Sequence, residues 1–111
     1  MKITRHFITI GQRRVHYRKS GSGPTLLMVH QSPRNSAEYE PLMRKWGEHF
    51  TCIAPDTAGF GQSDPLTGSA EVGDFAAALF EFMDAVGIAQ TAAYGFHSGA
   101  TILVTALRRD P

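Results

Sequence analysis

Residues 93–100 read Ala93-Tyr94-Gly95-Phe96-His97-Ser98-Gly99-Ala100. This apolar run breaks into small residues and continues as a helical pattern, so it predicts a strand, a sharp corner and a helix start. Gly95 and Gly99 flank the corner, where a Cβ atom would meet the neighbouring backbone. Such a turn can hold the side chain between the two glycines above the edge of a sheet, and here that side chain belongs to His97.

The composition is that of one small globular domain. The chain has 111 residues, of which 42% are hydrophobic and 19% are charged, so it can bury a core. The net charge is +1, and Cys52, the single cysteine, cannot form an internal disulfide and is expected to be a small core residue. The early basic residues alternate with apolar ones, which indicates a solvated strand face rather than a nucleic-acid-binding surface. These residues are Lys2, Arg5, Arg13, Arg14, Arg18 and Lys19.

The N-terminal residues lack the apolar run of a signal peptide, and no stretch approaches the length of a membrane span. We therefore expect a cytoplasmic protein that binds neither membranes nor nucleic acid.

Strand and helix patterns alternate after an N-terminal hairpin that turns at residues 11–12. This order predicts an α/β fold, with a mostly parallel sheet, helices on both faces and an antiparallel edge formed by the hairpin. The predicted strands cover residues 3–10, 14–19, 25–29, 51–54 and 91–94, and the predicted helices cover residues 36–49, 69–86 and 100–107.

The helix over residues 69–86 has clear signals at both ends. Ser69 is expected to cap it, and the acidic Glu71 and Asp74 in its first turn are favourable against the helix dipole. Gly87 is expected to end it in a left-handed conformation.

Three loops follow the central strands and begin at His30, Asp56 and Phe96. The carboxyl ends of parallel strands lie at one edge of the sheet, where ligands bind in folds of this kind. We therefore expect the three loops to form one site for a small-molecule substrate.

These three loops resemble motifs of the α/β-hydrolase fold family. The segment His30-Gln31-Ser32-Pro33 is similar to the His-Gly-x-Pro loop that follows the family's third strand. Residues 55–64, Pro-Asp-Thr-Ala-Gly-Phe-Gly-Gln-Ser-Asp, are close to its Pro-Asp-x-x-Gly-x-Gly-x-Ser-Asp segment. Residues 95–99 stand where the family has its nucleophile elbow, which normally carries Ser, Cys or Asp. The chain thus resembles the N-terminal part of an α/β-hydrolase domain.

The resemblance implies roles for individual residues. It implies that the backbone N–H groups of Ser32 and Ser98 form an oxyanion hole, in which two donors stabilise a developing negative oxygen. It also implies catalytic candidates at His97 and Ser98. Gln31 departs from the pattern, because glycine is usual at that position. The expected loop-shaping residues are His30, Gln31, Asp56, Gly95 and Gly99.

Two registers compete at the elbow. With Gly95 and Gly99 as the flanking residues, His97 occupies the nucleophile position. With the His-Ser pair matched to the family's common Gly-His-Ser, Ser98 is the nucleophile and Phe96 replaces a small residue. We favour His97, because the tight corner tolerates a bulky phenylalanine poorly.

The chemistry that follows from His97 stays open between three classes. An imidazole can accept or donate a proton near neutral pH, so His97 fits a hydrolase of esters, amides or carbon–carbon bonds. The alternatives are a catalytically silent, ligand-binding protein and a lyase-type enzyme on the same scaffold. No motif calls for a cofactor or a metal. The remaining histidines are expected to be structural: His30 ties down its loop, His49 ends a helix, and His6 and His16 form a cross-strand surface pair.

In the resembled family, the acid and the histidine of the catalytic triad come from later strands than those seen here. We therefore expect residues 1–111 to be the N-terminal portion of one incomplete domain. The strand over residues 91–94 would then lie at an exposed apolar edge, which favours pairing with other chains. The 111-residue chain by itself is predicted to be inactive and prone to aggregate.

Overall fold

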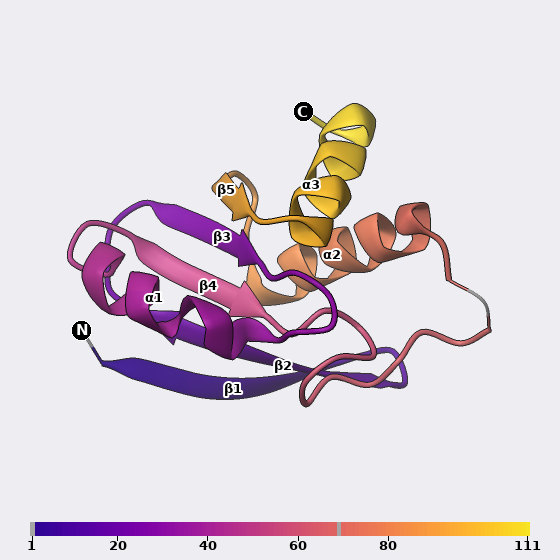
Figure 1. Cartoon of the computed structure of the whole chain (residues 1–111), viewed down its shortest axis with the longest axis horizontal. Helices are drawn as coiled ribbons and strands as arrows, with labels where there is room; N and C mark the ends of the chain where they lie inside the picture. The colour runs from indigo at the N-terminus through magenta and orange to yellow at the C-terminus, as the bar shows by residue number, and fades with distance from the viewer. Residues whose placement is uncertain (1, 69) are drawn as a thin grey trace.

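The computed structural model describes residues 2–68 and 70–111 and has the expected alternation of strands and helices (Figure 1). The strands are β1 (Ile3–Ile10), β2 (Arg13–Ser20), β3 (Thr25–Val29), β4 (Thr51–Pro55) and β5 (Ala92–Gly95). The helices are the 3₁₀ helix η1 (Ser36–Tyr39), α1 (Glu40–Trp46), α2 (Val72–Val86) and α3 (Ser98–Arg109).

The strands form one mixed sheet in the order β1-β2-β4-β3-β5. The β1–β2 hairpin is antiparallel and joins the rest through antiparallel pairing of β2 with β4. Strands β3, β4 and β5 run parallel, so their carboxyl ends meet at one edge of the sheet. The predicted sheet, with its antiparallel hairpin, is confirmed.

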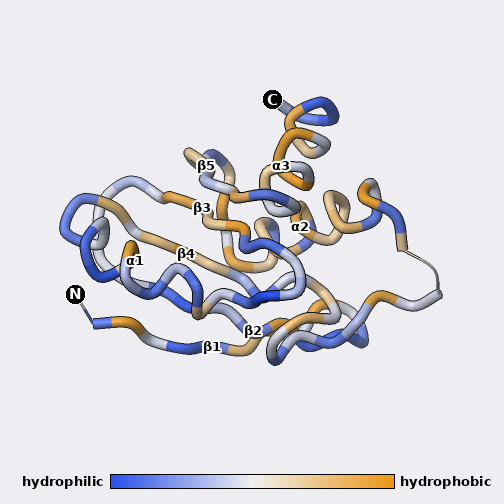
Figure 2. The backbone as a smooth tube through the Cα atoms, viewed as in Figure 1, coloured by the Kyte–Doolittle hydropathy of each residue, from blue (hydrophilic) through white to orange (hydrophobic). Residues whose placement is uncertain are grey.

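Helices cover both faces of the sheet, and each face has its own core. Along β3, Leu27 and Val29 face α2 and α3, whereas Leu26 and Met28 face α1. This alternation explains why β3 is apolar at consecutive positions, since a strand buried on both faces needs apolar side chains on each. Figure 2 shows hydrophobic colours along much of β3 and β4. Cys52 is fully buried in the core beneath α1, as predicted, and this burial raises the pKa of its thiol.

The predicted helix over residues 36–49 is wrong in its extent. The segment begins as the 3₁₀ helix η1, continues as α1 and ends at Trp46. Pro41 lies in the first turn of α1 and has no N–H, so it cannot donate the hydrogen bond that would continue an α-helix from η1. His49 lies in the turn that follows, where its N–H donates to the carbonyl of Trp46.

The ends of the other helices differ by a few residues from expectation. Helix α2 starts at Val72, with Glu71 and Asp74 accepting hydrogen bonds from each other's backbone N–H groups in a capping box. Gly87 ends α2 with φ at 80°, as predicted. The predicted cap at Ser69 lies outside the described residues. Strand β5 is shifted by one residue from the predicted range, and α3 starts at Ser98 rather than residue 100.

The predicted surface pair of His6 and His16 is wrong, whereas the predicted solvated face holds for Lys2, Arg5, Arg14 and Lys19, which are exposed, and fails for Arg18. The β1–β2 register places His6 opposite Tyr17 and Phe7 opposite His16. His16 is fully buried, and the Arg18 side chain is also largely buried, with its guanidinium bonded to Glu40. The reason is that His16 faces the loop after β4, where its Nδ1 binds Asp56, and Arg18 faces η1 and α1, where its guanidinium binds Ser36 and Glu40.

Strand β5 lies at an edge of the sheet, as expected, and its residues 92–94 are exposed. Among the described residues, no helix combines the length and apolar character needed to cross a bilayer.

Candidate active site

The turn between β5 and α3 holds His97 in an unusual backbone conformation. Its φ is 54° and its ψ is −118°, and among the described residues it is the one non-glycine position with positive φ. L-amino acids rarely adopt this region, and holding one there costs on the order of 1–3 kcal/mol. The side chain is exposed, and its ring packs against the Phe96 ring at 4.2 Å between centroids.

The glycines on either side of this turn are required by close packing. A Cβ atom on Gly99 would lie 2.1 Å from the Val29 carbonyl oxygen, and one on Gly95 would lie 2.8 Å from the Ala100 nitrogen. Both distances are too short for any side chain. Residue 97 therefore lies at the apex of the turn. The His97 register depends on this placement.

The loop after β3 meets the start of α3 through two serines that are 66 residues apart in sequence. The backbone N–H of Ser32 donates to the hydroxyl of Ser98 at 2.6 Å. The backbone N–H of Ser98 lies at the first position of α3, where helix geometry leaves it without an intrahelical acceptor. The two residues expected to supply oxyanion-hole donors are thus brought together, with one donor already bonded to the Ser98 side chain.

His30 joins the loop after β3 to the loop after β4. Its Nε2 accepts a hydrogen bond from the Thr57 N–H at 2.8 Å, so the ring proton must be on Nδ1. That Nδ1–H donates to the carbonyl of Gln31, also at 2.8 Å. His30 is buried and meets the Phe60 ring edge-on.

Gln31 is held by a carboxylate that the sequence did not single out. The backbone N–H of Gln31 donates to Glu38 Oε1 at 2.7 Å, and its side-chain amide donates to Glu38 Oε2 at 3.2 Å.

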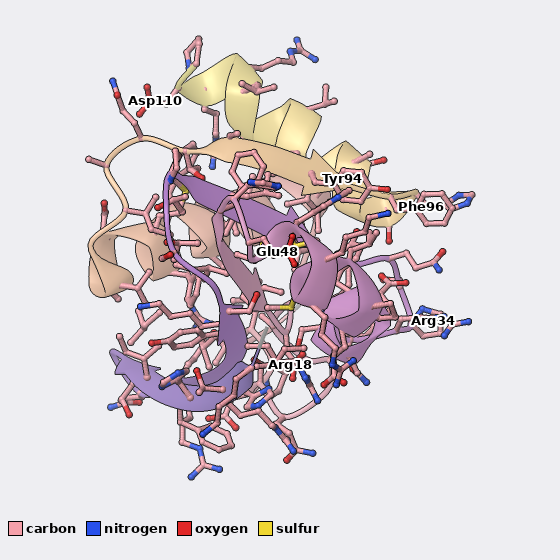
Figure 3. The ribbon with its side chains drawn as sticks, turned by 90° about the vertical axis from the view of Figure 1, so that its left-hand side faces the viewer. Arg18, Arg34, Glu48, Tyr94, Phe96 and Asp110 are labelled. Atoms are coloured by element: carbon pink, nitrogen blue, oxygen red, sulfur yellow. The ribbon has the colours of Figure 1, made fainter. Side chains whose placement is uncertain are left out.

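Figure 3 shows Phe96 projecting beyond the end of β5, with Arg34 of the loop after β3 toward the same end of the molecule.

Asp56 is buried at the start of the loop after β4, and its carboxylate binds residues of η1, of β2 and of its own loop. Its Oδ1 accepts hydrogen bonds from the N–H and the hydroxyl of Ser36, and its Oδ2 accepts from the Gln62 N–H and from His16 Nδ1. Burial opposes the ionisation of Asp56, but the hydrogen bonds from Gln62, Ser36 and His16 outweigh it and hold the pKa below its usual value. Among the described residues, no hydrogen bond joins Asp56 to His97.

The arginine of β1 fixes the protonation pattern of His16. Arg5 Nε donates to His16 Nε2 at 3.0 Å, so the ring proton must be on Nδ1, which donates to Asp56 at 2.8 Å. A neutral imidazole thus links a buried carboxylate to a guanidinium.

Tyr39 ties η1 to the end of β3 beneath the site. Its hydroxyl donates to the carbonyl of Val29 at 2.8 Å. Burial raises the pKa of Tyr39 far above its usual value, with smaller contributions from the charges of Glu38 and Tyr94, while a backbone hydrogen bond from Phe96 opposes the shift. Tyr39 is therefore a neutral hydrogen-bond donor.

Sequence reasoning missed His16, Ser36 and Glu38 as partners of the site loops. For His16 a signal existed, because His16, Arg18 and Ser20 alternate along β2 as three polar residues on one face. Glu38 gave no such signal, because its contact with Gln31 depends on how the loop folds back on η1.

Comparison with known proteins agrees with this geometry. Residues 24–111 match the alpha/beta hydrolase fold family. The chain is 34% identical over 110 residues to 2-(acetamidomethylene)succinate hydrolase of Mesorhizobium japonicum, covering 96% of this chain and 40% of that protein. It is 32% identical over 90 residues to haloalkane dehalogenase 2 of Mycobacterium tuberculosis, covering 80% of this chain and 32% of that protein.

The fold is also that of solved hydrolase structures. The crystal structure of E-2-(acetamidomethylene)succinate hydrolase superimposes with a TM-score of 0.91 at 32% identity, covering 99% of this chain and 41% of that one. The chain thus spans about a third to two fifths of the length of these relatives. From residue 24 onward it matches the family pattern, and it belongs to the alpha/beta hydrolase fold family.

Proposed function

We propose that the full-length protein hydrolyses a small-molecule ester, amide or related bond, and that His97 lies at the centre of its site. The observation that carries this proposal is the positive φ of an exposed histidine at the apex of the β5–α3 turn. A fold holds a non-glycine residue in such a conformation only when the surrounding structure demands it, and these residues cluster at functional sites. The relatives named above are a hydrolase and a dehalogenase, which supports a hydrolytic reaction.

The role we propose for His97 is that of a general base. Neither ring nitrogen of His97 has a hydrogen-bond partner within the described part of the chain, so both are open to a water molecule. In the proposed step the imidazole takes a proton from water while the water oxygen bonds to the substrate carbonyl carbon. The leaving group then departs with that proton. A stable covalent acyl intermediate is less natural for imidazole than for a serine hydroxyl.

We propose that the remaining catalytic groups come from segments that this chain does not contain. In the family it belongs to, the triad acid and histidine follow later strands, and the chain spans about a third to two fifths of the relatives described above. The 111-residue chain alone is accordingly proposed to be inactive. The substrate is proposed to be a small molecule that enters at the carboxyl ends of β3, β4 and β5.

A second function is favoured by one contact. The Ser32 N–H already donates to the Ser98 hydroxyl, so it is not available to stabilise a developing negative oxygen. A protein that lacks this donor can bind a ligand without hydrolysing it. Saturable binding without turnover would identify that alternative.

The test is hydrolysis of p-nitrophenyl butyrate by the full-length protein and by its His97→Ala, Ser98→Ala and His49→Ala variants. General-base catalysis contributes about 10²–10⁴-fold, so His97→Ala is expected to lose that factor. His49 is an exposed histidine at the opposite ends of the strands, and His49→Ala should keep the wild-type rate. Full activity in His97→Ala combined with complete loss in Ser98→Ala would assign the reaction to Ser98 instead.

A further inference from the structure

The backbone N–H groups of the loop after β3 are already committed. Ser32 N–H donates to the Ser98 hydroxyl at 2.6 Å, Gln31 N–H donates to Glu38 at 2.7 Å, and Arg34 N–H donates to the Gln31 carbonyl at 2.9 Å. Pro33 has no N–H. From residue 31 to residue 34, no backbone donor of this loop is left for a substrate.

Two free donors remain on the other side of the contact, and both belong to Ser98. Its backbone N–H lies in the first turn of α3, and its hydroxyl oxygen accepts from Ser32. In the part of the chain that the structure describes, neither the N–H nor the O–H of Ser98 has an acceptor. A hydroxyl that accepts one hydrogen bond becomes a stronger donor in the next, because the two bonds polarise each other.

We infer that the Ser98 hydroxyl is a catalytic hydrogen-bond donor in the hydrolysis proposed above. The substrate oxygen that gains negative charge accepts one hydrogen bond from the Ser98 N–H and one from the Ser98 O–H. Ser32 acts as a positioning residue, since its N–H orients and polarises the hydroxyl from behind. No bond to Ser98 forms and its hydroxyl keeps its proton, so this role differs both from a nucleophile and from a hole built of two backbone N–H groups.

This inference rests on the proposed function, and variants of one residue test its catalytic part. Removing a single oxyanion donor typically lowers kcat by about 10²–10³-fold, and the freed Ser32 N–H replaces part of the loss. Ser98→Ala should therefore lower kcat by about 10²-fold with KM little changed, and Ser98→Thr, which keeps a hydroxyl, should restore most of it. The matched control is Thr105→Ala, because the Thr105 hydroxyl donates only to the Thr101 carbonyl in the same helix.

A second measurement does not depend on turnover. Backbone amide resonances of the full-length protein are followed while n-butylboronic acid, whose tetrahedral borate resembles the charged intermediate, is added. The inference predicts that the Ser98 amide resonance shifts and that the Ser32 amide resonance stays in place, because Ser32 remains bonded to the hydroxyl. In Ser98→Ala, the Ser32 amide should become the one that responds.

The outcomes separate the two proposals. Shifts of both amides in the wild-type protein, or a Ser98→Ala variant with wild-type kcat, would overturn the hydroxyl's role and leave the hydrolase proposal standing. No shift of either amide together with no ester hydrolysis would overturn both.

Discussion

Replacing Asp56 by asparagine is expected to destabilise the protein strongly while leaving the shape of the side chain unchanged. Each carboxylate oxygen of Asp56 accepts two hydrogen bonds, those of Oδ1 from Ser36 and those of Oδ2 from Gln62 and His16. Asparagine puts an NH₂ group in place of one oxygen. Whichever way the amide turns, two of the four donors around Asp56 would then point at this NH₂ group instead of at an acceptor.

The magnitude follows from the fact that neither side of Asp56 can adapt. His16 must keep its proton on Nδ1, because Arg5 donates to Nε2. On the other side, the Ser36 N–H cannot turn away, and the Ser36 hydroxyl oxygen already accepts from Arg18. Each buried donor left without an acceptor costs about 1–3 kcal/mol, so two of them lower the free energy of unfolding by about 3 kcal/mol. The site loops would loosen with it, since Asp56 joins them.

The assay is urea unfolding of the full-length protein, followed by circular dichroism. Asp64→Asn is the matched control, because Asp64 accepts one hydrogen bond from the exposed Arg14 N–H and should cost less than about 1 kcal/mol. Losses that agree within about 0.5 kcal/mol for the two variants would show that the buried hydrogen bonds of Asp56 stabilise the fold no more than the exposed one of Asp64.

The same carboxylate predicts an acid-side pH dependence. The pKa of Asp56 in the folded protein lies below its ordinary value of 3.8, so its ionisation stabilises the fold above that value. This contribution is lost as the pH falls from 3.8 through the lower folded pKa. The wild-type protein should therefore lose more unfolding free energy over this acid range than Asp56→Asn does. Equal losses in the two proteins would contradict the depressed pKa.

Three further predictions concern the turn, the core and the sheet edge. Gly99→Ala should unfold the turn and lower the melting temperature sharply, because its Cβ would lie 2.1 Å from the Val29 oxygen. Gly73→Ala in α2 is the control: its added Cβ has open space, so it should be neutral or stabilising in the same melt. Tyr39→Phe removes the hydroxyl bonded to Val29 and should cost about 1–2 kcal/mol in urea unfolding; an unchanged midpoint would show that the contact is absent in solution. The 111-residue chain alone should scatter light as it associates through β5, and a lysine in place of the exposed Ala93 should reduce the scattering. A stable, monodisperse monomer would contradict this prediction.

Much of the fold was predictable because its signals are local. Apolar runs with glycine, serine or proline at their ends located the strands, and Gly87 located the end of α2. Pro41 was a local signal of the break between η1 and α1, but the helical spacing of the apolar residues over 36–49 favoured one continuous helix. The exposed position of His97 was predictable from Gly95 and Gly99, which lie two residues away on either side of it and allow the sharp turn.

The partners of the site were not predictable in the same way. His16 looks like a surface residue of a hairpin until β2 is known to pair with β4 as well as with β1. Its contact with Asp56 spans 40 residues, and the Ser32–Ser98 contact spans 66. Such contacts depend on how the sheet is ordered, and local spacing carries no information about that order.

Chemical rescue of the full-length His97→Ala variant tests the role of His97 most directly. The histidine is exposed, so its removal leaves space that free imidazole can enter from solvent. We expect p-nitrophenyl butyrate hydrolysis to fall by about 10²-fold or more in the variant and to recover in part, with saturation, as imidazole is added. A variant that keeps the wild-type rate without imidazole would show that His97 is not the general base.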